Sequence, residues 1–230
     1  MKIILEKFNE RVIEVNLYFK FLNSVLSTDI HLHSTSTGIG QPVDVEVQKI
    51  LKANFFLILY NLIEAIIRES IQEIYDSMAR DKLSYKLTRP EIQKIMINHK
   101  YKQIRESNSV NFVREIQEIL SDVIDDAIVM LEADSIPISG SLDARKIREI
   151  AKTFGFSEKT KKAKRGGADL FTVKNQRNSL AHGESTFSDC GRNYNINELE
   201  RIKDDVVFFI EDILKNISAY IEAKDYCIKK

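Results

Sequence analysis

The sequence has few residues that break helices and few that build disulfide or metal frameworks. Its 230 residues include three prolines, eight glycines, two cysteines and no tryptophan. So few helix breakers, in a chain rich in Leu, Ile, Glu and Lys, favour an all-α fold. Cys190 and Cys227 stand in no Cys-x-x-Cys or Cys/His spacing. We therefore expect two free thiols and no metal site built on them.

An excess of one charge is also missing, and so is a long uncharged apolar run. The 34 basic side chains balance the 34 acidic ones, so any nucleic-acid site has to be a local patch. The most apolar stretch, residues 55–67, contains Asn61 and Glu64 and falls short of the ~20 apolar residues that span a bilayer. The first residues acquire charges too early for a signal peptide. We expect a cytoplasmic protein with no membrane partner.

Apolar residues recur at three- and four-residue spacing, which predicts helices over residues 2–26, 43–79, 90–105, 110–131, 144–154, 169–182 and 196–225. The second helix is apolar almost all round in its middle, so we expect it at the centre of a bundle. Thr88 is the expected N-cap of the third helix and Asp143 that of the fifth. Either Asn195 or Asn197 is expected to cap the last helix.

We expect one domain over residues 1–230, with a helical insertion over about 82–135. Ile128 is one of the expected core positions of that insertion. Residues 28–42 have the composition of a loop. His31 and His33 lie in it without further ligands nearby in the sequence, so they are expected to be solvated histidines rather than a metal site.

The stretch ADLFTVKNQRNSLAHG, residues 168–183, is the most informative part of the chain. Asp169 is expected to cap a helix of about four turns, and Gly183 is expected to end it in a left-handed conformation. Three apolar residues fall on one side of this helix and are expected to face the core: Leu170, Val173 and Leu180.

Arg177, Asn178 and His182 lie in the second half of that helix. One interpretation is that cations near a helix C-terminus are favoured by the helix dipole. The other is that they act on a phosphate, because histidine transfers protons near neutral pH and arginine offers planar, permanently charged donors. At ~100° per residue, Asn178 and His182 share a face, whereas Arg177 lies about 140° from His182. Two copies of the helix meeting across a twofold axis would bring these groups into one groove.

The string RNSLAHG, residues 177–183, resembles the signature of the HEPN superfamily, in which four to six residues separate an Arg from a His and a polar residue follows the Arg. The sequence YN-x-x-E at Tyr60 to Glu64 is a second, weaker point of resemblance. The resemblance is best over about residues 140–225. It implies an α-helical bundle and a homodimeric, metal-independent endoribonuclease without cofactor. It also implies a role in phage defence or as a toxin, with an antitoxin or another defence-system protein as partner.

Asn61 and Glu64 are expected either to support this site or to serve bundle packing alone. Because an unpaired buried carboxylate is costly, Glu64 needs a partner. The candidates are Arg68, one helical turn away, and Arg177 or Asn178 of the signature helix.

A lysine-rich run precedes the signature helix. It is either a flexible solvated loop or a basic lip beside that helix that binds the RNA backbone, and we favour the second interpretation. The residues expected to bind RNA are Lys161, Lys162, Lys164 and Arg165.

The implied reaction uses the 2′-hydroxyl of RNA as the nucleophile, so the products carry a 2′,3′-cyclic phosphate and a 5′-hydroxyl. His182 is the expected general acid or base, Arg177 stabilises the transition-state charge, and Asn178 positions the groups. An alternative is a non-catalytic HEPN-like module that dimerises and binds RNA or nucleotides. A third is a structural helical bundle in which the string is coincidental.

Overall fold

The protein is described by a computed structural model. It describes residues 1–27, 31–33, 38, 40–106, 113–114, 116–117, 120–121, 124–125, 127–128 and 141–229. For residues 102–106 it describes the backbone alone. The described part is mostly helical, which confirms the all-α prediction in its main lines.

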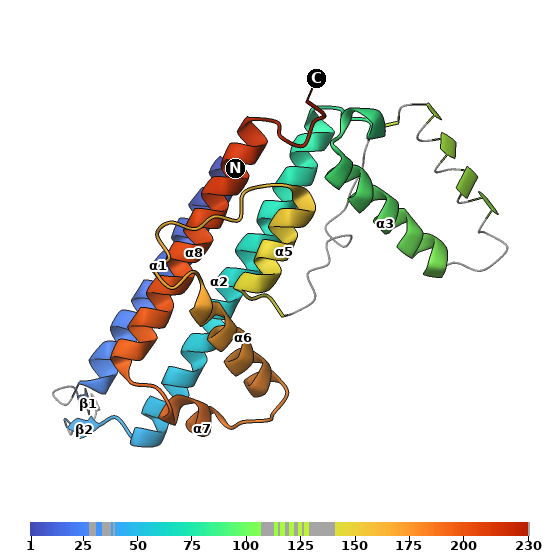
Figure 1. Cartoon of the computed structure of the whole chain (residues 1–230). Helices are drawn as coiled ribbons and strands as arrows, with labels where there is room; N and C mark the ends of the chain where they lie inside the picture. The colour runs from blue at the N-terminus through green and yellow to red at the C-terminus, as the bar shows by residue number, and fades with distance from the viewer. Residues whose placement is uncertain are drawn as a thin grey trace.

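Three long helices run side by side and form the body of the molecule (Figure 1): α1 (Lys2–Leu26), α2 (Val45–Arg80) and α8 (Ile196–Glu222). Three shorter helices pack against them, and α5 runs alongside α2 and α8: α5 (Ala144–Phe154), α6 (Ala168–Ala181) and α7 (Phe187–Arg192). The predicted helix bounds agree with the observed ones to within about three residues.

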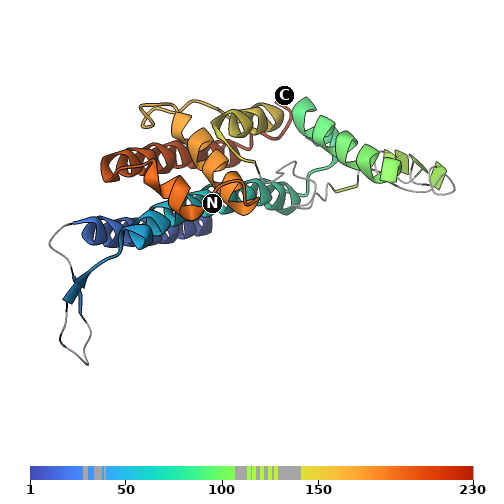
Figure 2. The same cartoon turned by 90° about the horizontal axis from the view of Figure 1, so that it is seen from below.

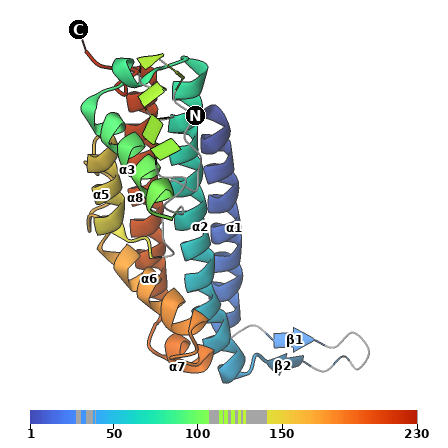
Figure 3. The ribbon, with the colours of Figure 1, turned by 90° about the vertical axis from the view of Figure 1, so that its right-hand side faces the viewer.

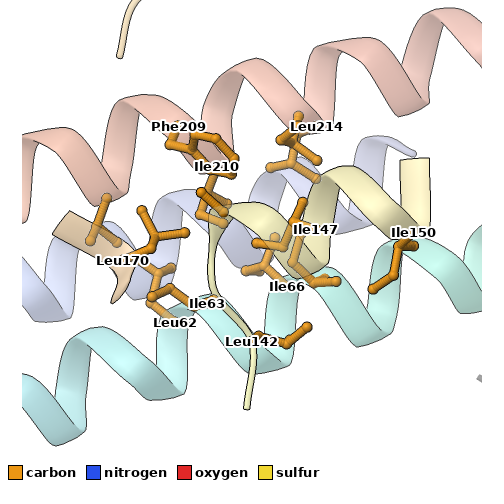
Figure 4. Packing of buried hydrophobic residues seen from close by; sticks show 14 of the residues in the cluster. Leu62, Ile63, Ile66, Leu142, Ile147, Ile150, Leu170, Phe209, Ile210 and Leu214 are labelled. Carbon is orange, nitrogen blue, oxygen red and sulfur yellow. The ribbon is translucent and has the colours of Figure 1, made fainter. Parts of the chain in front are cut away.

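Helix α2 occupies the centre of the bundle, as its apolar middle predicts. It contacts α1, α6, α7 and α8. Its side chains Leu62, Ile63 and Ile66 are at most 1% exposed. Figure 4 shows them meeting residues of α5, α6 and α8. Helix α2 is also long and apolar enough to cross a membrane by length and composition, but half of its most apolar window is buried within the bundle, as a core helix requires.

Asn195 is the N-cap of helix α8, which settles the choice between the two predicted caps. Asn195 and Glu198 form a reciprocal capping box: the Asn195 side chain accepts from the Glu198 N–H at 2.9 Å, and the Glu198 carboxylate accepts from the Asn195 N–H at 2.8 Å. The apolar stripe of α8 is buried, and the helix packs on α2 and α6.

The predicted loop over residues 28–42 contains a small two-stranded antiparallel sheet, which is a departure from a purely helical fold. Strand β1 (His31–His33) pairs with β2 (Gly40–Pro42). Figure 2 shows this hairpin extending away from one end of the helical body. Both histidines are exposed, and no group of three metal-ligating side chains occurs among the described residues.

The opposite end carries the 3₁₀ turn η1 (Tyr85–Leu87) and helix α3 (Pro90–Glu106), which projects from the body (Figures 1 and 2). The prediction that Thr88 caps α3 is wrong, because its hydroxyl donates backward to the Tyr85 carbonyl at 2.8 Å. Most of the predicted helix over residues 110–131 lies outside the described residues. Ile128, an expected core residue, is 48% exposed. One domain with an insertion over about 82–135 stays a prediction.

Helix α7 is absent from the predictions, because its six residues, with Phe187 as the one large apolar side chain, carry no periodic apolar signal. Thr186 caps it by accepting from the Asp189 N–H at 3.0 Å. Gly191 then permits close contact with α2, since a Cβ there would lie 1.9 Å from the Lys49 carbonyl oxygen.

Candidate functional site

The start of α6 is held by a carboxylate from another helix. Asp205 of α8 accepts from the backbone N–H groups of Gly167 at 3.3 Å and Asp169 at 3.1 Å. Gly167 is the N-cap and has φ +78°, where glycine is favoured. The prediction that Asp169 caps this helix is therefore wrong. Asp169 is buried inside the first turn, with its carboxylate 3.0 Å from Arg165 and 3.5 Å from Arg201.

The end of α6 follows the prediction closely. The helix stops at Ala181, His182 is the C-cap, and Gly183 has φ +70°. The Glu184 N–H then donates to the Ser179 carbonyl at 2.9 Å, which closes the last turn. The inward face is as expected, with Leu170, Val173 and Leu180 all buried.

Arg177 lies flat against the central helix. Its guanidinium carbon is 4.5 Å from the centroid of the Tyr60 ring, and its Nη1 donates to Asn178 Oδ1 at 3.0 Å. Asn178 Nδ2 in turn donates to Ser141 Oγ at 3.3 Å. Two of the three signature residues are thus joined to each other and to neighbouring segments.

Glu64 contacts both of its predicted partners. One carboxylate oxygen, Oε1, accepts from Arg68 Nη2 at 3.2 Å, and the other, Oε2, lies 3.9 Å from Arg177 Nη2. The prediction that Glu64 reaches the signature helix is therefore borne out in geometry. Asn61 instead accepts from Arg11 of α1, at 2.6 Å.

A groove of about 400 Å³ opens on α2 beside Arg177. Seven of its lining residues belong to α2, and the eighth is Arg177: Leu57, Tyr60, Asn61, Glu64, Ala65, Arg68, Glu69 and Arg177. Figure 3 shows α2 beside α1, with α6 on the other side of α2. The groove places Asn61, Glu64 and Arg177 around one open space.

His182 does not join that groove in a single chain. Its side chain is exposed and makes no hydrogen bond or ion pair with any described residue. Arg177, by contrast, is half-buried and turned toward α2. The structure therefore keeps the two residues on different sides of α6, as their five-residue separation predicts.

The segment beneath Arg177 is tied to the bundle by residues that the sequence did not assign to the site. The Tyr60 hydroxyl accepts from the Leu142 N–H at 3.2 Å. Asp143 caps α5 by accepting from the Lys146 N–H at 2.9 Å, as predicted, and it also pairs with Lys174 of α6 at 2.6 Å. These bonds join α2, α5 and α6 directly below the candidate site.

The environment of Asp143 stabilises its charged form. Burial alone would raise its pKa, but the Lys174 ammonium and the Lys146 N–H outweigh that effect and hold the pKa of Asp143 below its usual value. The carboxylate is 4% exposed. Its charge therefore contributes to the attachment of α6.

The lysine-rich loop is attached to the bundle through its backbone. Asp212 of α8 accepts from the N–H groups of both Lys161 and Lys162 at 2.6 Å. The Asn216 side chain donates to the carbonyls of Ser157 and Lys159, both at 2.8 Å. A loop held in this way presents its side chains from one fixed backbone.

Its cations fall into two groups. Lys162 lies 2.6 Å from Glu211, and Arg165 lies 3.0 Å from Asp169. Lys161 and Lys164 are exposed and have no acidic partner among the described residues. The loop leads into the first turn of α6, whereas His182 follows its last turn, about 21 Å away at ~1.5 Å per residue. The basic lip thus lies at the far end of the signature helix from His182 in one chain.

The two cysteines are free thiols. Burial raises the pKa of Cys190 to about 11, so it is a weak nucleophile near neutral pH.

A mostly helical bundle around one long central helix is the architecture of a HEPN-type protein. The chain belongs to this class: residues 1–226 match the model of the HEPN_MAE_28990 family, a HEPN-like family. No curated protein and no solved structure matches it.

Proposed function

We propose that this protein is a metal-independent endoribonuclease whose site forms between two copies of the chain. The observation that supports the proposal is how the signature residues lie on α6. Arg177 and Asn178 are fixed toward α2, and His182 is exposed at the end of the same helix. A second copy related by a twofold axis can place its His182 opposite the first copy's Arg177.

The chemistry follows from the side chains. RNA carries its own nucleophile, the 2′-hydroxyl, which attacks the adjacent phosphorus and expels the 5′-oxygen of the next nucleotide. His182 moves a proton at one of these oxygens. The Arg177 guanidinium stabilises the negative charge on the phosphoryl oxygens, and Asn178 keeps that guanidinium in place through its 3.0 Å contact.

A local basic patch, rather than the net charge of the protein, supports RNA as the substrate. Lys161 and Lys164 offer unpaired cations on an anchored loop, as expected for contacts to a phosphate backbone. Membership of a HEPN family supports a further proposal, a role as a toxin or in phage defence with a partner protein that controls it.

The test is cleavage of total and transfer RNA by wild type and by His182→Ala, side by side in EDTA. We expect cleavage by wild type alone, with 2′,3′-cyclic phosphate and 5′-hydroxyl ends. Equal cleavage by both proteins, or products with 3′-hydroxyl ends, would contradict the mechanism. Inactivity of both would favour the non-catalytic binding module. Induction in cells extends the test, because a toxin should arrest growth as wild type and not as His182→Ala.

A further inference from the structure

The groove beside Arg177 contains polar groups that the cleavage chemistry leaves unused. Its volume of about 400 Å³ is in the range of small-molecule sites and is sufficient for a nucleotide. Leu57, Tyr60 and Ala65 give it apolar lining, and Asn61 and Glu64 add a polar edge next to Arg177. An apolar space with a few convergent polar groups beside a phosphate-binding residue is suited to a nucleobase.

Asn61 lines this groove, and its amide nitrogen can donate hydrogen bonds. One of the two terminal atoms of the Asn61 side-chain amide lies 2.6 Å from Arg11 Nη1. Because arginine only donates, the atom facing Arg11 has to be the oxygen Oδ1. The Nδ2 group makes no hydrogen bond with the described residues, and the side chain is exposed. Arg11 therefore fixes the orientation of the amide and leaves its donors available.

Glu64 presents an acceptor next to these donors. Its Oε1 accepts from Arg68 Nη2 at 3.2 Å. Its Oε2 lies 3.9 Å from Arg177 Nη2, which is beyond hydrogen-bond distance. Oε2 accepts no hydrogen bond from the described residues, so it keeps its capacity to accept. Asn61 and Glu64 are three residues apart on α2, so their Cβ atoms are about 5–6 Å apart on one face of the helix.

We propose that the groove binds a guanine base of the RNA, adjacent to the phosphate at Arg177. The Watson–Crick edge of guanine carries the acceptor O6 beside two neighbouring donors, N1–H and N2–H. Asn61 donates to O6, and the Glu64 carboxylate accepts from N1–H and N2–H. Adenine and cytosine offer one amino donor beside an acceptor, and uracil offers one N–H between two acceptors, so each makes fewer bonds to this pair. The inference rests on the proposed function, since it is Arg177 that places the phosphate.

The experiment compares single-stranded oligoribonucleotides of one sequence in which a single guanosine is replaced by inosine or adenosine. Inosine differs from guanosine only by the missing N2 amino group. We expect kcat/KM at that position to fall about tenfold with inosine, because one hydrogen bond to a charged carboxylate is lost. Glu64→Gln should reduce the guanosine-to-inosine ratio several-fold. The matched control is Glu10→Gln on α1, an exposed carboxylate without a contact to any described residue, which should leave the ratio unchanged.

The ratio separates base reading from other effects of the Glu64 substitution. A shift of Arg177 caused by losing the Glu64 charge would slow cleavage of guanosine and inosine substrates alike. Equal cleavage of both by wild type, or an unchanged ratio in Glu64→Gln, overturns the proposal and leaves the ribonuclease intact.

A binding arm uses the same sequences with 2′-fluoro sugars, which lack the nucleophile. Tighter binding of guanine than hypoxanthine by wild type, lost in Glu64→Gln, would support the groove even if no RNA were cleaved. Equal binding of the two bases would overturn it.

Discussion

The lysine-rich loop allows a sharp prediction, because two adjacent lysines differ in their partners. Lys161 and Lys162 both receive backbone support from Asp212, and both are exposed. Only Lys162 has an acidic partner among the described residues, Glu211 at 2.6 Å. A cation already paired with a carboxylate releases fewer counterions when it meets RNA. Lys161→Ala should therefore weaken RNA binding more than Lys162→Ala.

The magnitude follows from counterion release. Each single-strand phosphate contact contributes about 0.7 to the slope of log K against log salt concentration. Removing two contacts with Lys161→Ala/Lys164→Ala should flatten the slope by about 1.4, which corresponds to about 25-fold weaker binding at 0.1 M salt. Lys162→Ala should flatten the slope of log K against log salt concentration by less than half of the ~0.7 that one phosphate contact contributes.

The assay is fluorescence anisotropy with labelled, 2′-fluoro single-stranded RNA across a salt series. A folding control by circular dichroism accompanies each variant. Equal slopes for wild type and the double variant would show that the loop does not contact RNA. Equal effects of Lys161→Ala and Lys162→Ala would refute the argument from pairing.

Two further predictions concern stability, measured by urea unfolding. Gly191→Ala places a Cβ 1.9 Å from the Lys49 carbonyl and should cost about 3 kcal/mol, against about 1 kcal/mol for Gly183→Ala, where nothing lies within 4 Å. Equal losses would contradict the packing argument. Asp143→Asn keeps the cap but loses the charge facing Lys174 and should cost about 2 kcal/mol at pH 7. The pKa of Asp143 is lowered in the folded protein, so its charge stabilises the fold fully above the unfolded pKa of about 4. This stabilisation is lost as the pH falls through the folded pKa. A difference in the free energy of unfolding between wild type and Asp143→Asn that stays constant below pH 4 would refute the argument.

Long apolar periodicity was enough to predict the main helices and their packing. The middle of α2 is apolar almost all round, and a helix of that kind belongs at the centre of a bundle. The cap at Asp143 was equally readable, because a short acceptor precedes an amphipathic segment. Helix α7 and the β1–β2 hairpin were not readable, since short elements depend on tertiary contacts such as that of Gly191 with Lys49.

The candidate site was predictable in its residues and only partly in its contacts. RNSLAHG predicts Arg177, Asn178 and His182 as the site residues, which stays a prediction, and the structure places Arg177 against Tyr60 and leaves His182 exposed. Asp169 was assigned as a cap from local sequence alone, whereas the actual cap, Asp205, comes from a helix 36 residues later in the chain. No local pattern shows such a long-range bond.

The central claim is that Arg177 of one copy works with His182 of another. The most direct measurement mixes Arg177→Ala and His182→Ala proteins, each inactive alone, after subunit exchange confirmed with labelled chains. In a mixed dimer one of the two composite sites regains both residues, so random exchange should restore about a quarter of wild-type RNA cleavage. A mixture no more active than the two variants apart would contradict the shared site.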